Sequence, residues 1–118
     1  MDRLFVYGTL MPGEALWGEL APFVIAWREA AAPGRMWDTG HGYPAVRFVP
    51  SGAPVPGVVV DLDPVRAPAA ITRLDEVEDA GVLYRRVEVV TTAGPAWAYE
   101  WLGPTGGLQP LPGGWRRD

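Results

Sequence analysis

The sequence contains no cysteine, no lysine and no asparagine among its 118 residues. Without cysteine the protein can form no disulfide and has neither a thiolate nucleophile nor a sulfur ligand for a metal. Without lysine all ten basic side chains are arginine, so the N-terminus is the only amine available for Schiff-base chemistry. These absences exclude thiolate and lysine mechanisms before any motif is considered.

Clustered positive charge and long apolar runs are also missing. The formal net charge is −4, and a scattered set of arginines does not supply the basic surface that nucleic-acid phosphates require. No apolar run approaches the length of a membrane span, and Met1 is followed at once by Asp2 and Arg3, unlike a signal peptide. We therefore expect a soluble, cytoplasmic protein with no nucleic-acid or membrane partner; the oligomeric state is left open.

Glycine and proline are abundant, with 15 and 13 residues, yet 48% of the residues are hydrophobic and six are tryptophan. That composition indicates a folded, loop-rich sheet protein rather than a disordered chain. The length predicts a single domain over residues 1–118, with a core at 4–101 and a Gly/Pro-rich tail at 103–118.

Hydrophobic patterning predicts several short strands and one helix. The run Leu4–Tyr7 is continuously apolar, which is typical of a central strand buried on both faces. Proline at its first position predicts a helix from about Pro68 to Glu78. The fold class that follows is α+β: a compact, mixed, strongly curved sheet or small β-barrel with one packed helix. The other predicted strands lie at about 24–27, 34–37, 45–49, 57–62, 83–91 and 96–101.

The turn after the first strand, in the stretch LFVYGTLMPGE, is the first candidate site. Gly8 and Gly13 have the spacing of a phosphate-binding loop, but Glu14 and Ala15 replace its Lys and Ser or Thr, and Pro12 removes an amide donor. A smaller anion such as a carboxylate suits it better. Gly8 would permit an unusual backbone angle, and the N–H groups at positions 8–10 could converge on the ligand. A plain tight turn explains the same residues.

The acidic cluster LDEVEDAG, residues 74–81, is the second candidate site. On a helix, Glu78 falls on the apolar face defined by Ile71 and Leu74, whereas Glu76 falls on the wet face. Burial raises the pKa of a carboxyl, so Glu78 is a candidate general base near neutral pH. The alternative is structural: Glu78 pairs with an arginine such as Arg86, or reaches solvent at the helix end.

Other catalytic residue types occur in unpromising contexts. His41 is the only histidine and lies in a Gly-rich loop, and Ser51 lacks the strand-turn-helix pattern of a nucleophilic serine. Asp61 and Asp63 are better explained as a strand end and a turn or cap residue than as metal ligands. We predict no metal site.

Read together, the two candidate sites resemble the gamma-glutamylcyclotransferase-like superfamily, especially its small members similar to gamma-glutamylamine cyclotransferase. The resemblance covers residues 4–101, and the ordered set of motifs is specific. One departure is Asp79, which follows Glu78 where family members often have glycine, and whose charge bears on the pKa of Glu78. The matching stretches are VYGTL at 6–10, YPAV at 43–46, Val55-x-Gly57-x-Val59, Leu74-Asp75-x-x-Glu78, Tyr84-x-Arg86 and AWAY at 96–99.

The resemblance implies a barrel-like α+β fold whose cavity takes a gamma-glutamyl group, with no cofactor. It implies that Glu78 is the catalytic acid and base, and that the opening turn binds the amino-acid end of the glutamyl group. The substrate's own alpha-amine would attack its gamma-carbonyl and release 5-oxoproline. A non-catalytic module that binds an amino-acid-like ligand on the same fold is the alternative. The implied substrate-binding residues are Tyr7, Gly8, Thr9, Leu10, Tyr84 and Tyr99.

Overall fold

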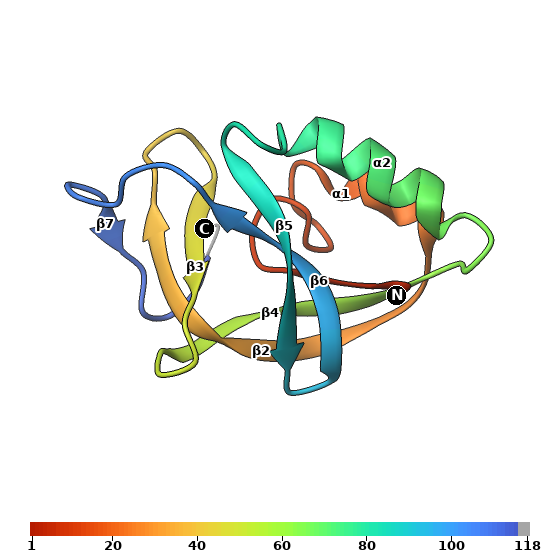
Figure 1. Cartoon of the computed structure of the whole chain (residues 1–118), viewed down its shortest axis with the longest axis horizontal. Helices are drawn as coiled ribbons and strands as arrows, with labels where there is room; N and C mark the ends of the chain where they lie inside the picture. Colours follow the sequence, from red (N-terminus) through yellow and green to blue (C-terminus); the bar gives the residue numbers. More distant parts are fainter. Residues whose placement is uncertain (116–118) are drawn as a thin grey trace.

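The computed structural model describes residues 1–115 and contains one sheet of seven strands. The strand order is β3-β2-β4-β1-β6-β5, with β7 paired to β2, and only the β1–β6 pairing is parallel. The mixed sheet curls until it is nearly closed into a barrel (Figure 1). The strands are β1 (Arg3–Val6), β2 (Val24–Asp38), β3 (Pro44–Phe48), β4 (Ala53–Leu62), β5 (Tyr84–Thr91), β6 (Gly94–Trp101) and β7 (Gln109–Pro110).

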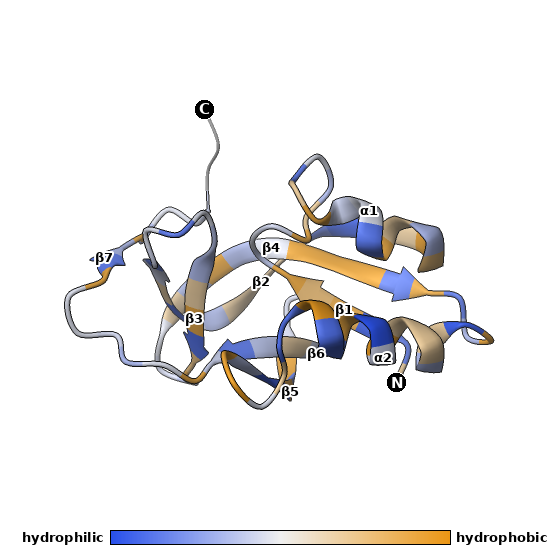
Figure 2. Ribbon diagram, turned by 90° about the horizontal axis from the view of Figure 1, so that it is seen from above, coloured by the Kyte–Doolittle hydropathy of each residue, from blue (hydrophilic) through white to orange (hydrophobic). Residues whose placement is uncertain are grey.

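Strand β1 is the central strand that its continuous apolar run predicts. It lies between β4 and β6, and alternate side chains enter two different hydrophobic clusters. Leu4 and Val6 pack beneath the helices, whereas Phe5 and Tyr7 fill the interior of the curved sheet. The hydropathy colouring shows apolar residues along β1 and β4, the two strands at the middle of the molecule (Figure 2).

The curled ends of the sheet are held together by polar contacts. The Phe48 N–H of β3 donates to the Glu100 carboxylate of β6 at 2.9 Å. On the other side, Ala31 of β2 and Thr92 of the β5–β6 turn exchange two hydrogen bonds, of 2.9 and 3.0 Å. These contacts bring the β2–β3 end of the sheet against β5 and β6.

The main helix, α2 (Ala67–Val77), packs on one face of the sheet through Ala70 and Leu74. It has Pro68 in its first turn, as predicted, and its ends differ by one residue each from the predicted bounds. Glu78 is its C-cap, and the chain then leaves the helix through Asp79, which adopts a positive φ of 52°. Aspartate tolerates this left-handed conformation better than most side chains.

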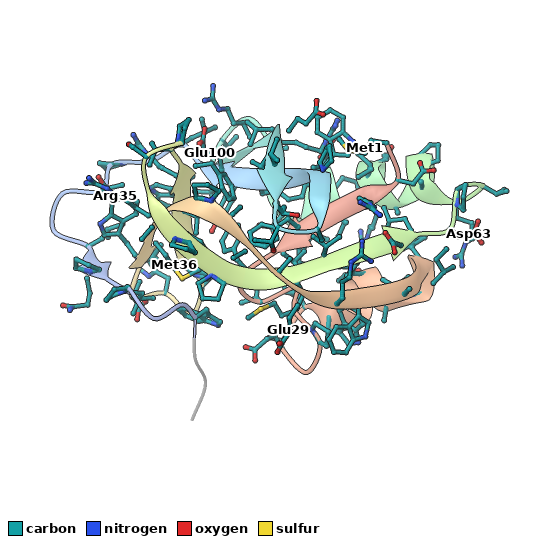
Figure 3. The ribbon with its side chains drawn as sticks, turned by 90° about the horizontal axis from the view of Figure 1, so that it is seen from below. Met1, Glu29, Arg35, Met36, Asp63 and Glu100 are labelled. Carbon is teal, nitrogen blue, oxygen red and sulfur yellow. The ribbon has the colours of Figure 1, made fainter. Side chains whose placement is uncertain are left out.

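The predictions for residues 24–27 and 34–37 are wrong in one respect, because these are not two strands. They are the ends of one 15-residue strand, β2, whose middle pairs with β4 across Pro33 and Pro54. Proline and the polar residues before it suggested a break, but the strand's other edge is unpaired here, so the missing proline N–H costs no ladder bond. Beyond Pro33, Met36 turns into the core and Arg35 to solvent (Figure 3).

Two further segments differ from the predicted loops. Residues Trp17–Leu20 form a short helix, α1, followed by a 3-10 turn, η1 (Ala21–Phe23), so the sheet carries two helices rather than one. They are too short for a periodic pattern, but Leu20 is fully buried. The predicted tail contributes strand β7, which pairs with Trp37 and Asp38; its residues 116–118 lie outside the described part of the chain.

Within residues 1–115, no helix combines the length and the apolar character that crossing a membrane would require.

We expect Leu74→Ala to lower the free energy of unfolding by about 2–5 kcal/mol, because it leaves a cavity between α2 and the sheet. Leu74 is 0% exposed. Chemical denaturation measures the loss. Val65→Ala is the control, since Val65 is 89% exposed and its truncation should change stability by no more than about 0.5 kcal/mol. Equal effects of the two substitutions would contradict the packing described for α2.

Candidate functional site

The turn that follows β1 is positioned by close contact with β3. A Cβ atom added to Gly8 would lie 2.6 Å from Cγ of Pro44, so only glycine fits at this point. The backbone of Gly8 does not have a positive φ, and the prediction of an unusual angle there is therefore wrong. Glycine is required by the approach of the Pro44 ring, which lies far away in the sequence and gives no local signal.

The N–H groups of this turn are free to bind a ligand. Those of Gly8, Thr9 and Leu10 donate no hydrogen bond within residues 1–115, although Gly8 and Leu10 are buried. The turn is held instead by carbonyl groups: Gly8 O accepts from the Met11 N–H at 3.0 Å, and Thr9 O from the Leu16 N–H at 2.8 Å. Because buried N–H groups normally have partners, three free ones at a cavity wall form a candidate anion site.

Glu78 reaches the cavity beside this turn from the end of α2. Its backbone N–H donates to Leu74 O at 2.8 Å, which extends the last turn of α2 and keeps Glu78 on the face that Leu74 buries. The same cavity is lined by Gly8, Thr9, Leu10 and Glu78. The helix end and the strand end thus meet at one hollow, although some seventy residues separate them.

Two other carboxylates of the acidic cluster, Asp75 and Glu76, have partners. Asp75 Oδ1 lies 3.1 Å from Nε of Arg86 and accepts a 2.7 Å hydrogen bond from the Tyr99 hydroxyl. Glu76 is exposed and lies 3.5 Å from Arg73. The alternative in which Arg86 pairs with Glu78 is therefore wrong, because Asp75, one turn earlier on α2, occupies that arginine.

The carboxyl of Glu78 has no hydrogen bond or ion pair with any other residue in the range 1–115. Burial raises its pKa from 4.5 to about 7, since the protein interior disfavours the charged form. The charge of Asp79 is not among the causes of this shift. A carboxyl with a pKa near neutrality can take up and return a proton at physiological pH.

Three of the four tyrosines in the wall have a hydroxyl that is already engaged. Tyr7 donates to Tyr99 O at 2.5 Å, Tyr84 to Pro44 O at 2.6 Å, and Tyr99 to Asp75. Burial is the main cause that raises the pKa of all three well above the usual range, so they remain protonated. Tyr7 therefore has no hydroxyl proton left to donate to a developing oxyanion.

All seven predicted site residues lie on one narrow inner cavity of about 20 Å³, a volume that holds about one water. It adjoins a wider outer pocket of about 260 Å³. Thr9, Tyr43, Glu78 and Tyr84 line both spaces. Sequence reasoning had not assigned Tyr43 to the site, although the YPAV motif that contains it was part of the family resemblance.

The remaining candidates do not line either space. His41 is exposed, and Ser51 lies in a turn beside a separate pocket formed with β2 and the tail. Asp61 pairs with Arg3 and Arg28, and the Asp63 carboxylate accepts the Val65 N–H at 3.0 Å. Within residues 1–115, no three carboxylate or histidine side chains are placed to hold a metal ion.

Comparison with known families gives one match, to the model described as "Gamma-glutamyl cyclotransferase, AIG2-like", over residues 4–117. No curated protein matches the chain.

Several solved structures have the same fold. An AIG2-like protein from Mus musculus has a TM-score of 0.74 and 18% identity, with 95% of this chain and 86% of that chain covered. An uncharacterized protein from Pyrococcus horikoshii has a TM-score of 0.71 and 24% identity, covering 94% and 86%. The protein ytfP from Escherichia coli has a TM-score of 0.64 and 28% identity, covering 98% and 96%.

We expect the raised pKa of Glu78 to appear as pH-dependent stability. Because the folded protein holds this proton more tightly than the unfolded chain, Glu78 destabilises the fold progressively as the pH rises from 4.5 to about 7. From about pH 4 to pH 8, the free energy of unfolding of the native protein should fall by about 2–3 kcal/mol relative to Glu78→Gln. Denaturant titrations of both proteins across this range measure the difference.

The matched control is Glu76→Gln, which removes an exposed carboxylate from the same helix. The free energy of unfolding of Glu76→Gln should vary with pH as that of the native protein does, without the gain in stability at high pH that we expect of Glu78→Gln. A constant difference between the native protein and Glu78→Gln at all pH values would show that the Glu78 carboxyl has an ordinary pKa.

Proposed function

The chain belongs to the AIG2-like gamma-glutamyl cyclotransferase family, and from this premise we propose that it releases 5-oxoproline from a gamma-glutamyl amine or peptide. One observation carries the proposal. The Glu78 carboxyl, unpaired and with a pKa of about 7, lines the same cavity as three backbone N–H groups that have no partner within residues 1–115. That combination supports a proton carrier and an anion site within one cavity.

The reaction needs no nucleophile from the protein, because the substrate carries one. Its alpha-amine attacks the gamma-carbonyl carbon and closes a five-membered ring, a geometry that intramolecular reactions favour strongly. The new C–N bond gives a tetrahedral oxyanion. When this intermediate collapses, the amide C–N bond breaks, and the products are 5-oxoproline and a free amine. No cofactor is required for this sequence of steps.

Glu78 would carry the proton between the two nitrogens. The ionised carboxylate removes a proton from the alpha-ammonium and so produces the neutral amine that can attack. The protonated carboxyl then delivers that proton to the departing nitrogen, and the second proton that the ring nitrogen loses on becoming an amide follows the same route, so the amine leaves as an ammonium. A pKa of about 7 suits both transfers, because neither protonation state is strongly disfavoured near neutral pH.

The opening turn would hold the anionic end of the glutamyl group. The free N–H groups of Gly8, Thr9 and Leu10 can bind the alpha-carboxylate, and a donor left over can stabilise the oxyanion. Tyr7, Tyr84 and Tyr99 donate elsewhere, so their role is to shape the wall. Since the inner cavity is only about 20 Å³, the glutamyl chain must extend from it into the outer pocket.

The assay for this function is release of 5-oxoproline, detected by mass spectrometry, from a panel of gamma-glutamyl peptides and gamma-glutamyl amines. We expect release by the native protein from at least one substrate and none above background by Glu78→Gln. Loss of a general acid and base typically costs about 10²–10⁴-fold in rate. The rate should also rise with pH through about 7, as Glu78 becomes ionised.

Asp79→Asn is the matched control, because it removes the neighbouring charge while asparagine still tolerates the positive φ found there. It should retain most of the activity. Equal release by a folded Glu78→Gln protein would overturn the catalytic assignment. Tight binding of gamma-glutamyl compounds without release by either protein would identify a binding module instead.

A further inference from the structure

The first half of strand β2 has an edge that no other strand covers. Strand β4 pairs with one side of this half, and β3 joins the other side only from Gly34 onwards. Within residues 1–115, nothing pairs with that other side before the hydrogen bonds of Ala31 with Thr92. A bulge just before Ala26 ends the regular ladder at the other end. Residues 26–30 between these limits are called the free edge.

The free edge carries backbone groups that point away from β4. In an antiparallel ladder, the N–H and C=O groups of alternate residues point to the same side. Those of Ala31 point away from β4, because both bond to Thr92. Trp27 and Glu29 precede Ala31 by four and two residues in an unbroken register, so their N–H and C=O groups point the same way. Pro33 follows the same alternation, and it needs no N–H there.

Two neighbouring side chains of the free edge complement each other. Trp27 is 50% exposed, although its indole is large and apolar. Glu29 shares its face of the strand, projects outward at the margin of the molecule (Figure 3), and has no hydrogen bond or ion pair within residues 1–115. Glu29 also lines an open pocket of about 530 Å³ together with Met11, Pro56 and Val58. An exposed indole and a hollow with an unpaired acceptor therefore lie side by side.

The occupant that fits a strand edge is another strand, because extended backbone presents donors and acceptors at the matching spacing. A second copy of β2 supplies such a strand. When a two-fold axis passes beside Arg28, the two free edges run antiparallel and Trp27 of each copy lies opposite Glu29 of the other. Each of these two pairs exchanges two backbone hydrogen bonds, with the Cα atoms about 5.5 Å apart. Each indole then reaches the pocket beside the opposite Glu29, whose carboxylate can accept its N–H.

The ends of the free edge fit the same arrangement. With the axis beside Arg28, the bulge at Ile25 of one copy lies opposite the Ala31–Thr92 contact of the other, so regular pairing stops at both ends together. The contact also covers Ile25, which is 65% exposed in the single chain. A two-fold contact of this kind uses the same edge of both copies and therefore closes as a dimer rather than extending into a filament.

The charge at the centre limits the strength of the contact. Arg28 of one copy lies opposite Arg28 of the other, and like charges in this position are unfavourable. Each arginine is 3.1 Å from Asp61 of its own copy, which offsets its charge in part. The contact should therefore be reversible and weak.

We propose that the protein forms a two-fold homodimer in which the free edges of β2 pair antiparallel and each Trp27 occupies the pocket beside Glu29 of the second copy. Five residues of strand from each copy make a small interface, so we expect a dissociation constant of about 10–100 µM. None of the residues 26–30 lines the candidate site, so dimer formation is independent of the proposed catalysis.

Sedimentation equilibrium between about 5 and about 500 µM protein tests for the dimer. We expect reversible dimer formation by the native protein, and dimer formation at least about thirtyfold weaker in Trp27→Lys, because buried tryptophans dominate small interfaces. Val65→Lys is the matched control, since it adds the same charge at another exposed apolar side chain, and it should behave as the native protein does. A native protein that stays monomeric overturns the proposal, as does equal dimer formation by Trp27→Lys.

A second pair of variants tests the backbone contribution. Glu29→Ala removes the carboxylate but keeps the N–H group, whereas Glu29→Pro removes both without breaking a bond to β4. We expect the proline variant to dimerise at least about fivefold more weakly than the alanine variant. Circular dichroism checks that both are folded. Equal dissociation constants of the two folded variants would contradict the strand pairing.

Disulfide trapping tests the register, because the chain has no cysteine of its own. Arg28→Cys places a thiol opposite itself across the axis, at a Cα separation of about 4.5 Å that permits a disulfide. Ala26→Cys is the control: its side chain is also exposed on the same face, but its two copies lie four residues apart, about 13 Å. We expect mild oxidation to link Arg28→Cys at least about tenfold faster. Equal rates would overturn the proposed dimer.

Discussion

The pairing of Asp75 with Arg86 and Tyr99 is the interaction on which the candidate site depends. Arg86 lies 3.1 Å from Asp75, the Tyr99 hydroxyl donates to the same carboxylate, and Tyr7 donates to the backbone of Tyr99. This series of contacts joins β5, α2, β6 and the end of β1. It holds the helix against the sheet, and because it occupies the nearby arginine, it leaves the Glu78 carboxyl without an ion-pair partner.

The turn after β1, which forms another part of the cavity wall, is held by a steric constraint rather than by an ion pair. Pro44 of β3 approaches Gly8 so closely that a side chain cannot be accommodated, and the Tyr84 hydroxyl also donates to Pro44 O. The turn is therefore held between the start of β3 and the interior while its N–H groups stay unoccupied. A rigid turn with free donors suits ligand binding, since little reorganisation is needed when an anion arrives.

Parts of the fold with a strong local pattern could be predicted from the sequence. The apolar run of β1, the Pro68 start of α2 and the alternating hairpin of β5 and β6 each carry their own signal, and each is present. The secondary-structure prediction failed where contacts with distant residues decide the local conformation. Strand β2 continues through Pro33 because β4 pairs with it, and the short helix α1 is stabilised by burying Leu20 rather than by its own periodicity.

The sequence by itself determined which groups were available for chemistry: no thiol, no lysine, one histidine, and one carboxylate on the apolar face of a helix. It also determined that Glu78 would be near the helix end, because helical spacing is a local property. Only the tertiary structure decided that Arg86 pairs with Asp75, that the turn and Glu78 line one cavity, and that the adjoining pocket is largely apolar. These depend on contacts between distant segments, and such contacts follow from how the sheet curls, which no local pattern records.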